Sequence, residues 1–291
     1  MSIKVSVSHR LNYNFSRSVI LGPHVLGLRP SPHCQTPILS YALKIYPQEH
    51  YLSWRQDIHG NFLARVNLPK PTEYLTIEVD IIAHLKPINP FDFLLEDHVI
   101  NYPFTYCYRE QKELAAFLEI TESGKLLQEW VESHRQKDIY TIDFLSFING
   151  ELAKDIGHII RLEEGILSCE ETLIKKIGSC RDSAWLLVQI FRHYGLAARF
   201  VSGYLIQLKP DILPLDGSTA VEEDTAGLHA WTEVYLPGAG WIGLDPTSGM
   251  LTTEGHIPLV STPEPSAASP VRGSSEPCES KLDFTVIVSR Y

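Results

Sequence analysis

The chain has 291 residues, of which 44% are hydrophobic and 21% are charged, a balance typical of a folded globular protein with one large or two modest domains. The formal net charge of -10 at pH 7 argues against nucleic acid as the main partner, because phosphate binding requires a basic surface. The sequence contains no run of 18 apolar residues, so we expect neither a transmembrane helix nor a membrane partner.

The cysteine pattern does not favour a disulfide framework or a structural zinc site, because the cysteines are odd in number, scattered and without CxxC spacing. They are Cys34, Cys107, Cys169, Cys180 and Cys278. We therefore expect reduced thiols, a cytoplasmic location, no metal ion and no other cofactor.

The first hundred residues predict β-structure. Segments that begin at Val5 or cover 41–47, 61–69 and 74–85 alternate polar and apolar residues and are rich in β-branched and aromatic side chains. The N-terminal segment has no apolar signal core, so we interpret it as a strand rather than a targeting peptide. Because turn signals separate these strands, we predict an antiparallel, sandwich-like β-domain over residues 1–108.

The hydrophobic period becomes helical from about Arg109. Residues 110–120, 125–134 and 141–159 have helical spacing, which predicts a helical connection over 109–160. The best-defined helix follows Cys180, where apolar residues recur at i, i+3 and i+4 and Gly195 supplies the C-terminal stop.

Strand patterns return after this helix. Residues 197–208, 229–237 and 240–247 predict strands that complete a core domain over 161–260. Residues 261–280 are rich in Pro and Ser and predict a loop. Residues 281–290 alternate again, and we expect this last strand to pair back into the N-terminal β-domain.

The stretch GSCRDSAWLL places a thiol at the mouth of the best-defined helix. Ser179 is a good N-cap residue and Asp182 falls at the N3 position of a capping-box-like pattern. Cys180 then occupies the first helical position, where the helix dipole favours a thiolate and where the Cys180 backbone N–H is free to bind an oxyanion. A small residue at a helix start is the alternative interpretation.

A nucleophilic thiol requires a base, and the base requires an orienting group. His229 opens one predicted strand, and Asp245 ends the next. A hairpin through residues 237–240 would bring these two positions side by side, so that Asp245 could hold the imidazole of His229 by a hydrogen bond.

The segments GSCRDSAWLLVQIFRHYGLAARFVSGYL and LHAWTEVYLPGAGWIGLDPTSG, with the spacing between them, resemble the transglutaminase-like superfamily of papain-type folds. This resemblance covers about Leu162–Pro258. The segments YNFSRSVILGPHVLGLRPSPHCQTP and INPFDF resemble the β-domain that precedes such a core in bacterial transglutaminase-like proteins. The resemblance implies an α+β fold in which a papain-like core, with the nucleophile helix packed on an antiparallel sheet, follows a β-sandwich-like domain.

By the same resemblance Cys180 is the nucleophile, His229 the general base and acid, and Asp245 the residue that orients His229. The implied chemistry is attack on an amide carbonyl of a peptide or protein substrate to form a thioester. Water then gives hydrolysis, which we expect, and an amine gives transamidation. The alternative is a non-catalytic binding module. Genes for ATP-dependent peptide-ligating enzymes commonly lie near such families, which implies a possible partner protein.

Five further residues have a functional and a structural interpretation. Arg181 and Asp182 could position or polarise the site, although capping and a local salt bridge are the simpler roles. Tyr204, Trp231 and Trp241 could line a substrate cleft, but large aromatic residues more often pack in a core.

Overall fold

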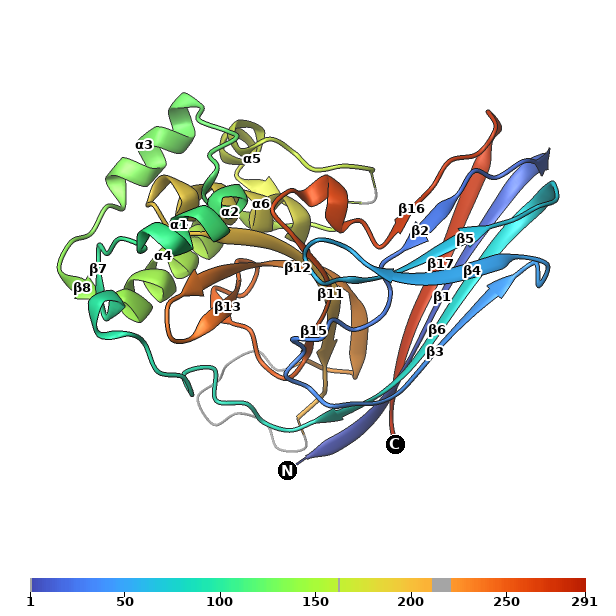
Figure 1. Cartoon of the computed structure of the whole chain (residues 1–291), viewed down its shortest axis with the longest axis horizontal. Coiled ribbons are helices and arrows are strands. Elements are labelled where there is room, and N and C mark those ends of the chain that lie inside the picture. Colours follow the sequence, from blue (N-terminus) through green and yellow to red (C-terminus); the bar gives the residue numbers. More distant parts are fainter. Residues whose placement is uncertain (1, 162, 211–220) are drawn as a thin grey trace.

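The computed structural model describes residues 2–161, 163–210 and 221–291. Its strands and helices form an α+β fold in which a half made of β-strands lies beside a half that holds the helices and a second sheet region (Figure 1). None of the helices in these described residues is long and apolar enough to cross a membrane.

The β-half contains two four-stranded sheets, of order β17-β1-β6-β3 and β16-β2-β5-β4. The strands are β1 (Ile3–Val19), β2 (His24–Leu26), β3 (Ile38–Tyr46), β4 (Tyr51–Gln56), β5 (Phe62–Asn67), β6 (Thr72–Leu85), β16 (Val271–Arg272) and β17 (Ser280–Arg290). The alternation seen in the sequence sets which side chains face inward, because Val5 and Val7 of β1 are buried and the residues between them are not. Antiparallel pairing joins β1 to β17 from Val5 opposite Arg290 to Phe15 opposite Ser280.

The prediction of a Pro/Ser-rich loop over residues 261–280 is wrong in part, because this segment contains a short helix and a strand. It holds the 3-10 helix η2 (Pro265–Ala268) and the strand β16, which pairs with β2. Ala268 is buried and its carbonyl accepts a hydrogen bond from the Ser202 hydroxyl. Tertiary contacts of this kind order a segment whose composition favours turns.

Short helices and strands connect the two halves. They are η1 (Asp97–Val99), β7 (Asn101–Tyr102), α1 (Tyr108–Glu113), α2 (Ala115–Leu118), α3 (Lys125–Ser133), β8 (Ile139–Tyr140), α4 (Thr141–Asp155), β9 (Gly157–His158), α5 (Cys169–Lys175) and β10 (Ile177–Gly178). The α5 helix was not predicted, because its seven residues are too few for a clear hydrophobic period.

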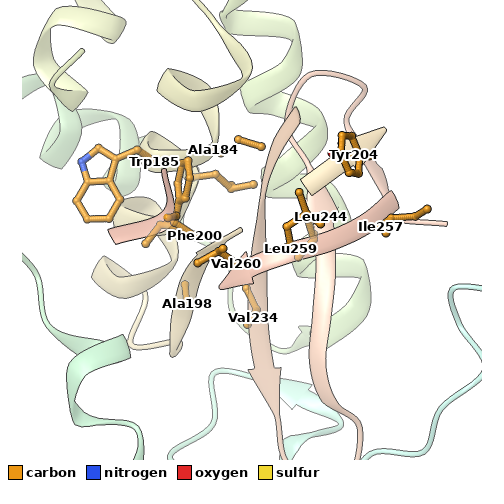
Figure 2. Close-up of a cluster of buried hydrophobic side chains, with 14 of the residues drawn as sticks. Ala184, Trp185, Ala198, Phe200, Tyr204, Val234, Leu244, Ile257, Leu259 and Val260 are labelled. Carbon is orange, nitrogen blue, oxygen red and sulfur yellow. The ribbon is translucent and has the colours of Figure 1, made fainter. Parts of the chain in front are cut away.

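The core domain packs one helix on a five-stranded sheet of order β14-β13-β12-β11-β15. Its elements are α6 (Cys180–His193), β11 (Ala198–Gln207), β12 (Thr225–Leu236), β13 (Gly240–Asp245), β14 (Met250–Leu251) and β15 (His256–Thr262). Figure 2 shows buried side chains of α6 and this sheet gathered in one hydrophobic cluster. Gly195 ends α6 with a φ of 78°, as the sequence predicts.

The helix α6 is buried on all sides, whereas the sequence predicts a single apolar stripe. Its residues from Asp182 to Arg192 are all buried, polar ones included. The Arg192 guanidinium donates to the carbonyls of Glu119, Ala198 and Pro263, so the buried charge is solvated by the backbone. A central helix therefore fixes the position of the thiol at its N-terminus.

The segment between β2 and β3 ties the β-half to the core sheet. The backbone N–H and the hydroxyl of Ser31 donate to the carbonyls of Pro258 and Leu259 in β15. The Thr36 hydroxyl donates to the carbonyl of Glu254, just before the same strand. These bonds hold β15 against the N-terminal sheets.

Candidate active site

Cys180 is the first residue of α6 and is partly exposed to solvent. Its backbone N–H is one of the four donors that a helix leaves unpaired at its N-terminus, as the sequence predicts. The strand β10 leads directly into this position and pairs in parallel with β9, so that Gly178 lies opposite His158. The thiol is thus presented at a fixed helix mouth.

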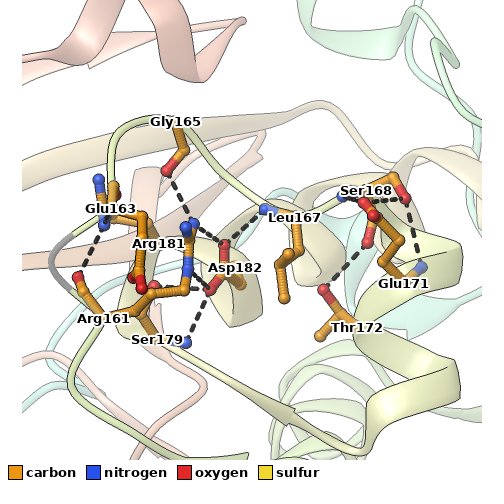
Figure 3. A network of polar contacts seen from close by, with 10 residues as sticks. All are labelled: Arg161, Glu163, Gly165, Leu167, Ser168, Glu171, Thr172, Ser179, Arg181 and Asp182. Atoms are coloured by element: carbon orange, nitrogen blue, oxygen red, sulfur yellow. Dashed lines mark hydrogen bonds and ion pairs between the residues drawn. The ribbon is translucent and has the colours of Figure 1, made fainter.

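The Asp182 carboxylate holds that helix mouth together (Figure 3). It is fully buried and accepts hydrogen bonds from the Arg161 guanidinium, the Leu167 backbone N–H, and both the backbone N–H and the hydroxyl of Ser179. Burial raises the pKa of Asp182, but the bonds from Arg161, Leu167 and Ser179 outweigh burial and lower it. An ionised carboxylate that only accepts hydrogen bonds supports position and cannot donate to an oxyanion.

Arg181 also serves the structure of this loop. Its guanidinium donates to the carbonyls of Arg161 and Glu163, at 3.0 and 2.9 Å. These bonds direct the Arg181 side chain onto the loop that precedes α5 (Figure 3). Of the two sequence interpretations, these contacts favour a local structural role for Arg181 over one in positioning or polarising the site.

The β12–β13 hairpin brings the predicted base and its orienting group together. Tyr235 lies opposite Trp241 and Thr232 opposite Leu244 in the hairpin register, and the His229 Nε2 lies 3.0 Å from the Asp245 Oδ2. Because Nε2–H donates to this carboxylate, Nδ1 is the nitrogen of His229 that is left for Cys180.

The electrostatics of His229 favour its protonated form. Burial lowers the pKa of His229, but the hydrogen bonds and charges of Asp245 and Cys180 outweigh burial and raise the pKa to about 9. For Asp245, burial raises the pKa, while the bonds from His229, His256 and Thr247 lower it strongly, so the carboxylate is ionised at neutral pH. An imidazolium between a carboxylate and a thiol is the arrangement from which a thiolate can attack.

His256, which the sequence gave no reason to select, is a second histidine on Asp245. Its Nε2 lies 3.3 Å from the Asp245 Oδ2, the oxygen that also faces His229. The Thr253 backbone N–H donates to the His256 Nδ1, so the proton of a neutral His256 is on Nε2 and is donated to Asp245. Only the tertiary structure brings the His256 side chain, at the start of β15, to Asp245 at the end of β13, so no local spacing signals this contact.

Thr247 completes the surroundings of the carboxylate. Its backbone N–H and hydroxyl both donate to the Asp245 Oδ1, at 2.9 and 2.8 Å. The Asp-Pro-Thr turn after β13 therefore supplies hydrogen-bond donors to the Asp245 Oδ1, while the two histidines contact the Oδ2. The carboxylate is held on both oxygens and cannot rotate away from His229.

The atoms of His229, Asp245 and His256 that could bind a metal ion all lie within 4.8 Å of one another. Among the described residues, these three form the one group of potential metal ligands that lie this close together. The same atoms form the hydrogen bonds His229–Asp245 and His256–Asp245, so each has a partner within the protein.

The prediction that Tyr204 lines a substrate cleft is wrong. Its side chain is fully buried, and its hydroxyl pairs with the His9 Nδ1 of β1 at 2.8 Å. Period-2 alternation in β11 directs this ring toward the N-terminal sheet, where it helps to join the two halves of the molecule.

The two tryptophans proposed for the cleft are packing residues of different clusters. Trp231 is 1% exposed, and its ring lies edge-on to that of His256, with 5.3 Å between the ring centres. The ring also packs over Gly203, because any side chain at that position would place its Cβ only 2.5 Å from the ring. Trp241 instead packs against Phe117 and under the Arg199 guanidinium. Trp231 therefore packs against His229 and His256, while Trp241 lies near the turn of the β12–β13 hairpin.

Two family descriptions match most of the chain. Residues 5–84 match the bacterial transglutaminase-like N-terminal region, and residues 131–246 match the transglutaminase-like superfamily. Cys180, His229 and Asp245 fall within the second range, whereas His256 lies beyond it. The two ranges correspond to the β-half and to the core that carries the site.

Proteins with similar sequences and a similar fold are known. An uncharacterized protein of Mycobacterium tuberculosis is 24% identical over 280 residues, which is 92% of this chain and 86% of that protein. An uncharacterized protein of Bacillus subtilis, YebA, is 34% identical over 74 residues, which is 25% of this chain and 10% of that protein. The crystal structure of a "Putative Cysteine Protease" from Cytophaga hutchinsonii superposes with a TM-score of 0.72 at 16% identity, over 100% of this chain and 91% of that one. At this identity the likeness shows the fold.

Replacement of Asp182 by Asn should destabilise the protein by about 3 kcal/mol, because the partly buried Arg161 would lose its counter-charge and the buried donors around Asp182 would lose a charged acceptor. The folded state lowers the pKa of Asp182, so this contribution is present above the pKa of an unfolded Asp and is lost as the pH falls. Urea denaturation at pH 7 and at about pH 3, which is below the ordinary Asp pKa of 3.8, measures both effects. The matched control is Glu171→Gln in the exposed capping box of α5, which should cost less than about 1 kcal/mol. Equal losses in the two variants would contradict the prediction.

Proposed function

Since the chain belongs to the transglutaminase-like superfamily and carries the bacterial transglutaminase-like N-terminal region, we propose that it is a thiol enzyme that acts on amide bonds of peptides or proteins. The observation that carries this proposal is the chain of contacts from Asp245 through His229 to Cys180 at the mouth of α6. A buried core histidine with a structural role alone would not need an ionised carboxylate on one nitrogen and a partly exposed thiol on the other.

In the acylation step the Cys180 thiolate attacks the amide carbonyl and a C–S bond forms. The oxygen of the tetrahedral intermediate takes the negative charge, and the Cys180 N–H is placed to donate to it. His229 then gives its proton to the leaving nitrogen as the C–N bond breaks, and the thioester remains. Asp245 stabilises the imidazolium throughout and holds the ring in place.

In the second step we propose water as the acceptor. His229, now neutral, removes a proton from water, the oxygen attacks the thioester carbonyl, and the C–S bond breaks to release a carboxylic acid and the free thiol. An amine in place of water would give transamidation by the same triad. The substrate class that we propose is a peptide or protein.

The surroundings of the enzyme are also part of the proposal. All five cysteines are free in the structure, which supports a reducing compartment such as the cytoplasm. We further propose that a peptide-ligating enzyme encoded nearby is a partner, so that this protein would trim what the partner joins.

The triad predicts acylation of Cys180 by a generic acyl donor. Incubation with p-nitrophenyl acetate should add one acetyl group at Cys180, and Cys180→Ala should abolish it, while His229→Ala should slow it by at least about 100-fold. Intact-protein mass spectrometry with peptide mapping measures the product. The control is Cys107→Ala, which removes an exposed cysteine outside the site. Acetylation at Cys107 as fast as at Cys180 would contradict a triad.

Competition between water and hydroxylamine distinguishes the two possible acceptors. With a glutaminyl peptide as donor, hydrolysis should release the free acid even in the presence of hydroxylamine, because we propose water as the acceptor. Mass spectrometry of the peptide identifies the product. A hydroxamate as the main product would assign transamidation instead.

Asp245 should raise the pKa of His229. In the wild type this pKa is about 9, and Asp245→Asn should lower it by at least about one unit, since the acceptor charge is lost. The stability that comes from this interaction is complete below the pKa of an unfolded His, about 6.5, and is lost as the pH rises through about 9. NMR titration of labelled histidine measures the pKa. An unchanged value in the variant would show that Asp245 does not act on His229.

His256 should act as a positioning residue through Asp245. His256→Ala should slow acetylation of Cys180 by about tenfold, because the carboxylate loses a donor and His229 loses a fixed partner. His256→Gln keeps an N–H donor and should retain more of the rate. Stopped-flow release of p-nitrophenol, with the NMR titration of His229 beside it, separates this role from a general loss of folding. If the two variants react alike and the His229 pKa does not change, His256 has only a packing role.

A further inference from the structure

A cavity of about 640 Å³ lies in the β-half, between the two four-stranded sheets and away from the triad. Its walls come from β3, β4, β5 and the segment between β2 and β3. The lining is mixed, and its large apolar side chains are Ile38 and Leu43 from β3, Leu52 and Trp54 from β4, and Phe62 from β5. A cavity of this size and composition is within the range of sites that bind small ligands or peptide side chains.

The cavity lining includes one charged side chain, that of Arg29. Its guanidinium carbon lies 4.5 Å from the ring centre of Phe62, 5.4 Å from that of Trp54 and 5.8 Å from that of Tyr41. Within the described ranges, Arg29 has no hydrogen bond and no ion pair, so the rings are its partners. The aromatic faces contact the guanidinium carbon, and Arg29 is only partly buried, so its N–H donors are accessible to an acceptor on a ligand.

The Tyr41 hydroxyl is a second polar group beside the cavity. The oxygen is buried and has no hydrogen-bond partner in the described part of the molecule. The Tyr41 ring packs edge-on against Trp54 at 6.0 Å, so the hydroxyl belongs to the same cluster as Arg29. A buried hydroxyl without a partner costs stability, and a planar anion that accepts from both groups would remove that cost.

The backbone beside the cavity is unpaired as well. β3 and β4 are each the last strand of their sheet, so each has one edge without a neighbouring strand among the described residues. Leu39 on β3 is 51% exposed and Trp54 on β4 is 40% exposed. An exposed edge with a pocket for alternate side chains is the geometry by which extended peptides are bound as an added strand.

We propose that this cavity is a peptide-binding site, separate from the triad, that takes an extended segment along β3. An acidic side chain of the peptide would accept hydrogen bonds from Arg29 and Tyr41, and large apolar neighbours would cover Trp54 and fill the cavity. Charge complementarity selects the acidic residue, since a guanidinium presents paired donors that match a carboxylate. The proposal concerns binding alone and holds whether or not Cys180 is a catalytic nucleophile.

Fluorescence polarisation with a labelled, end-capped peptide of sequence Val-Leu-Glu-Phe-Val tests the site in the full chain. The peptide should bind at least about tenfold more tightly than the same peptide with Gln in place of Glu. Arg29→Gln should remove this difference. The matched control is Arg55→Gln, which deletes the same charge on β4 one residue after Trp54, on the opposite face of the strand, and should keep the difference.

Tyr41→Phe gives a readout that a general loss of folding cannot imitate. The variant should bind the Glu peptide more weakly, and it should raise the thermal midpoint of the free protein, because a buried unpaired hydroxyl is removed. Weaker binding together with a lower thermal midpoint would point to damage of the cavity and would count against the proposal.

Three results would overturn the proposal. The first is equal binding of the Glu and Gln peptides, or equal losses in the Arg29 and Arg55 variants. The second is a changed affinity in Cys180→Ala, which would place the peptide at the triad. The third is displacement of the peptide by decanoate at an equal or lower concentration, which would assign the cavity to a small apolar carboxylate.

Discussion

The ionised carboxylate of Asp245 is the constraint around which the candidate site is built. A charge that is 1% exposed must be surrounded by donors, and here they come from three different parts of the core: His229 on β12, His256 on β15 and Thr247 in the turn after β13. The Asn149 side chain of α4 adds a bond to the Asp245 carbonyl. Satisfying one buried charge therefore fixes the spatial relation of two strands, a turn and a helix. The same charge prepares the imidazole that faces the thiol.

A second buried carboxylate, Asp182, fixes the Cys180 side of the candidate site. It joins the N-terminus of α6 to the loop before α5 through Arg161 and Leu167, and it binds Ser179, which follows β10. Two buried anions, each fully hydrogen-bonded, thus hold the two sides of the candidate site. Because neither can be displaced without leaving unpaired donors, the geometry of the site is coupled to the stability of the core.

The β-half contributes to the site indirectly. Its segment 30–37 is bonded to β15, the strand that begins with His256, and Tyr204 of β11 pairs with His9 of β1. A further link is the contact between His33 of this segment and the buried Glu233 of β12. Burial raises the pKa of Glu233, but Arg199 and His33 outweigh burial and lower this pKa to about 2. The cavity around Arg29 opens on the same segment, so a peptide bound there would contact the part of the β-half that supports β15.

The sequence by itself determined the strands of alternating pattern, the helix after Cys180 and its stop at Gly195, because these follow from local periodicity and turn chemistry. It also determined the three triad candidates, since a thiol at a helix start and a hairpin of known length are local features. Tertiary structure alone decided the rest. His256 reaches Asp245 only because β15 crosses the sheet to pair with β11, and Tyr204 is buried only because another sheet covers β11. Contacts between segments that are distant in the chain leave no periodic trace in it, which is why the sequence could select the three candidate residues but not their surroundings.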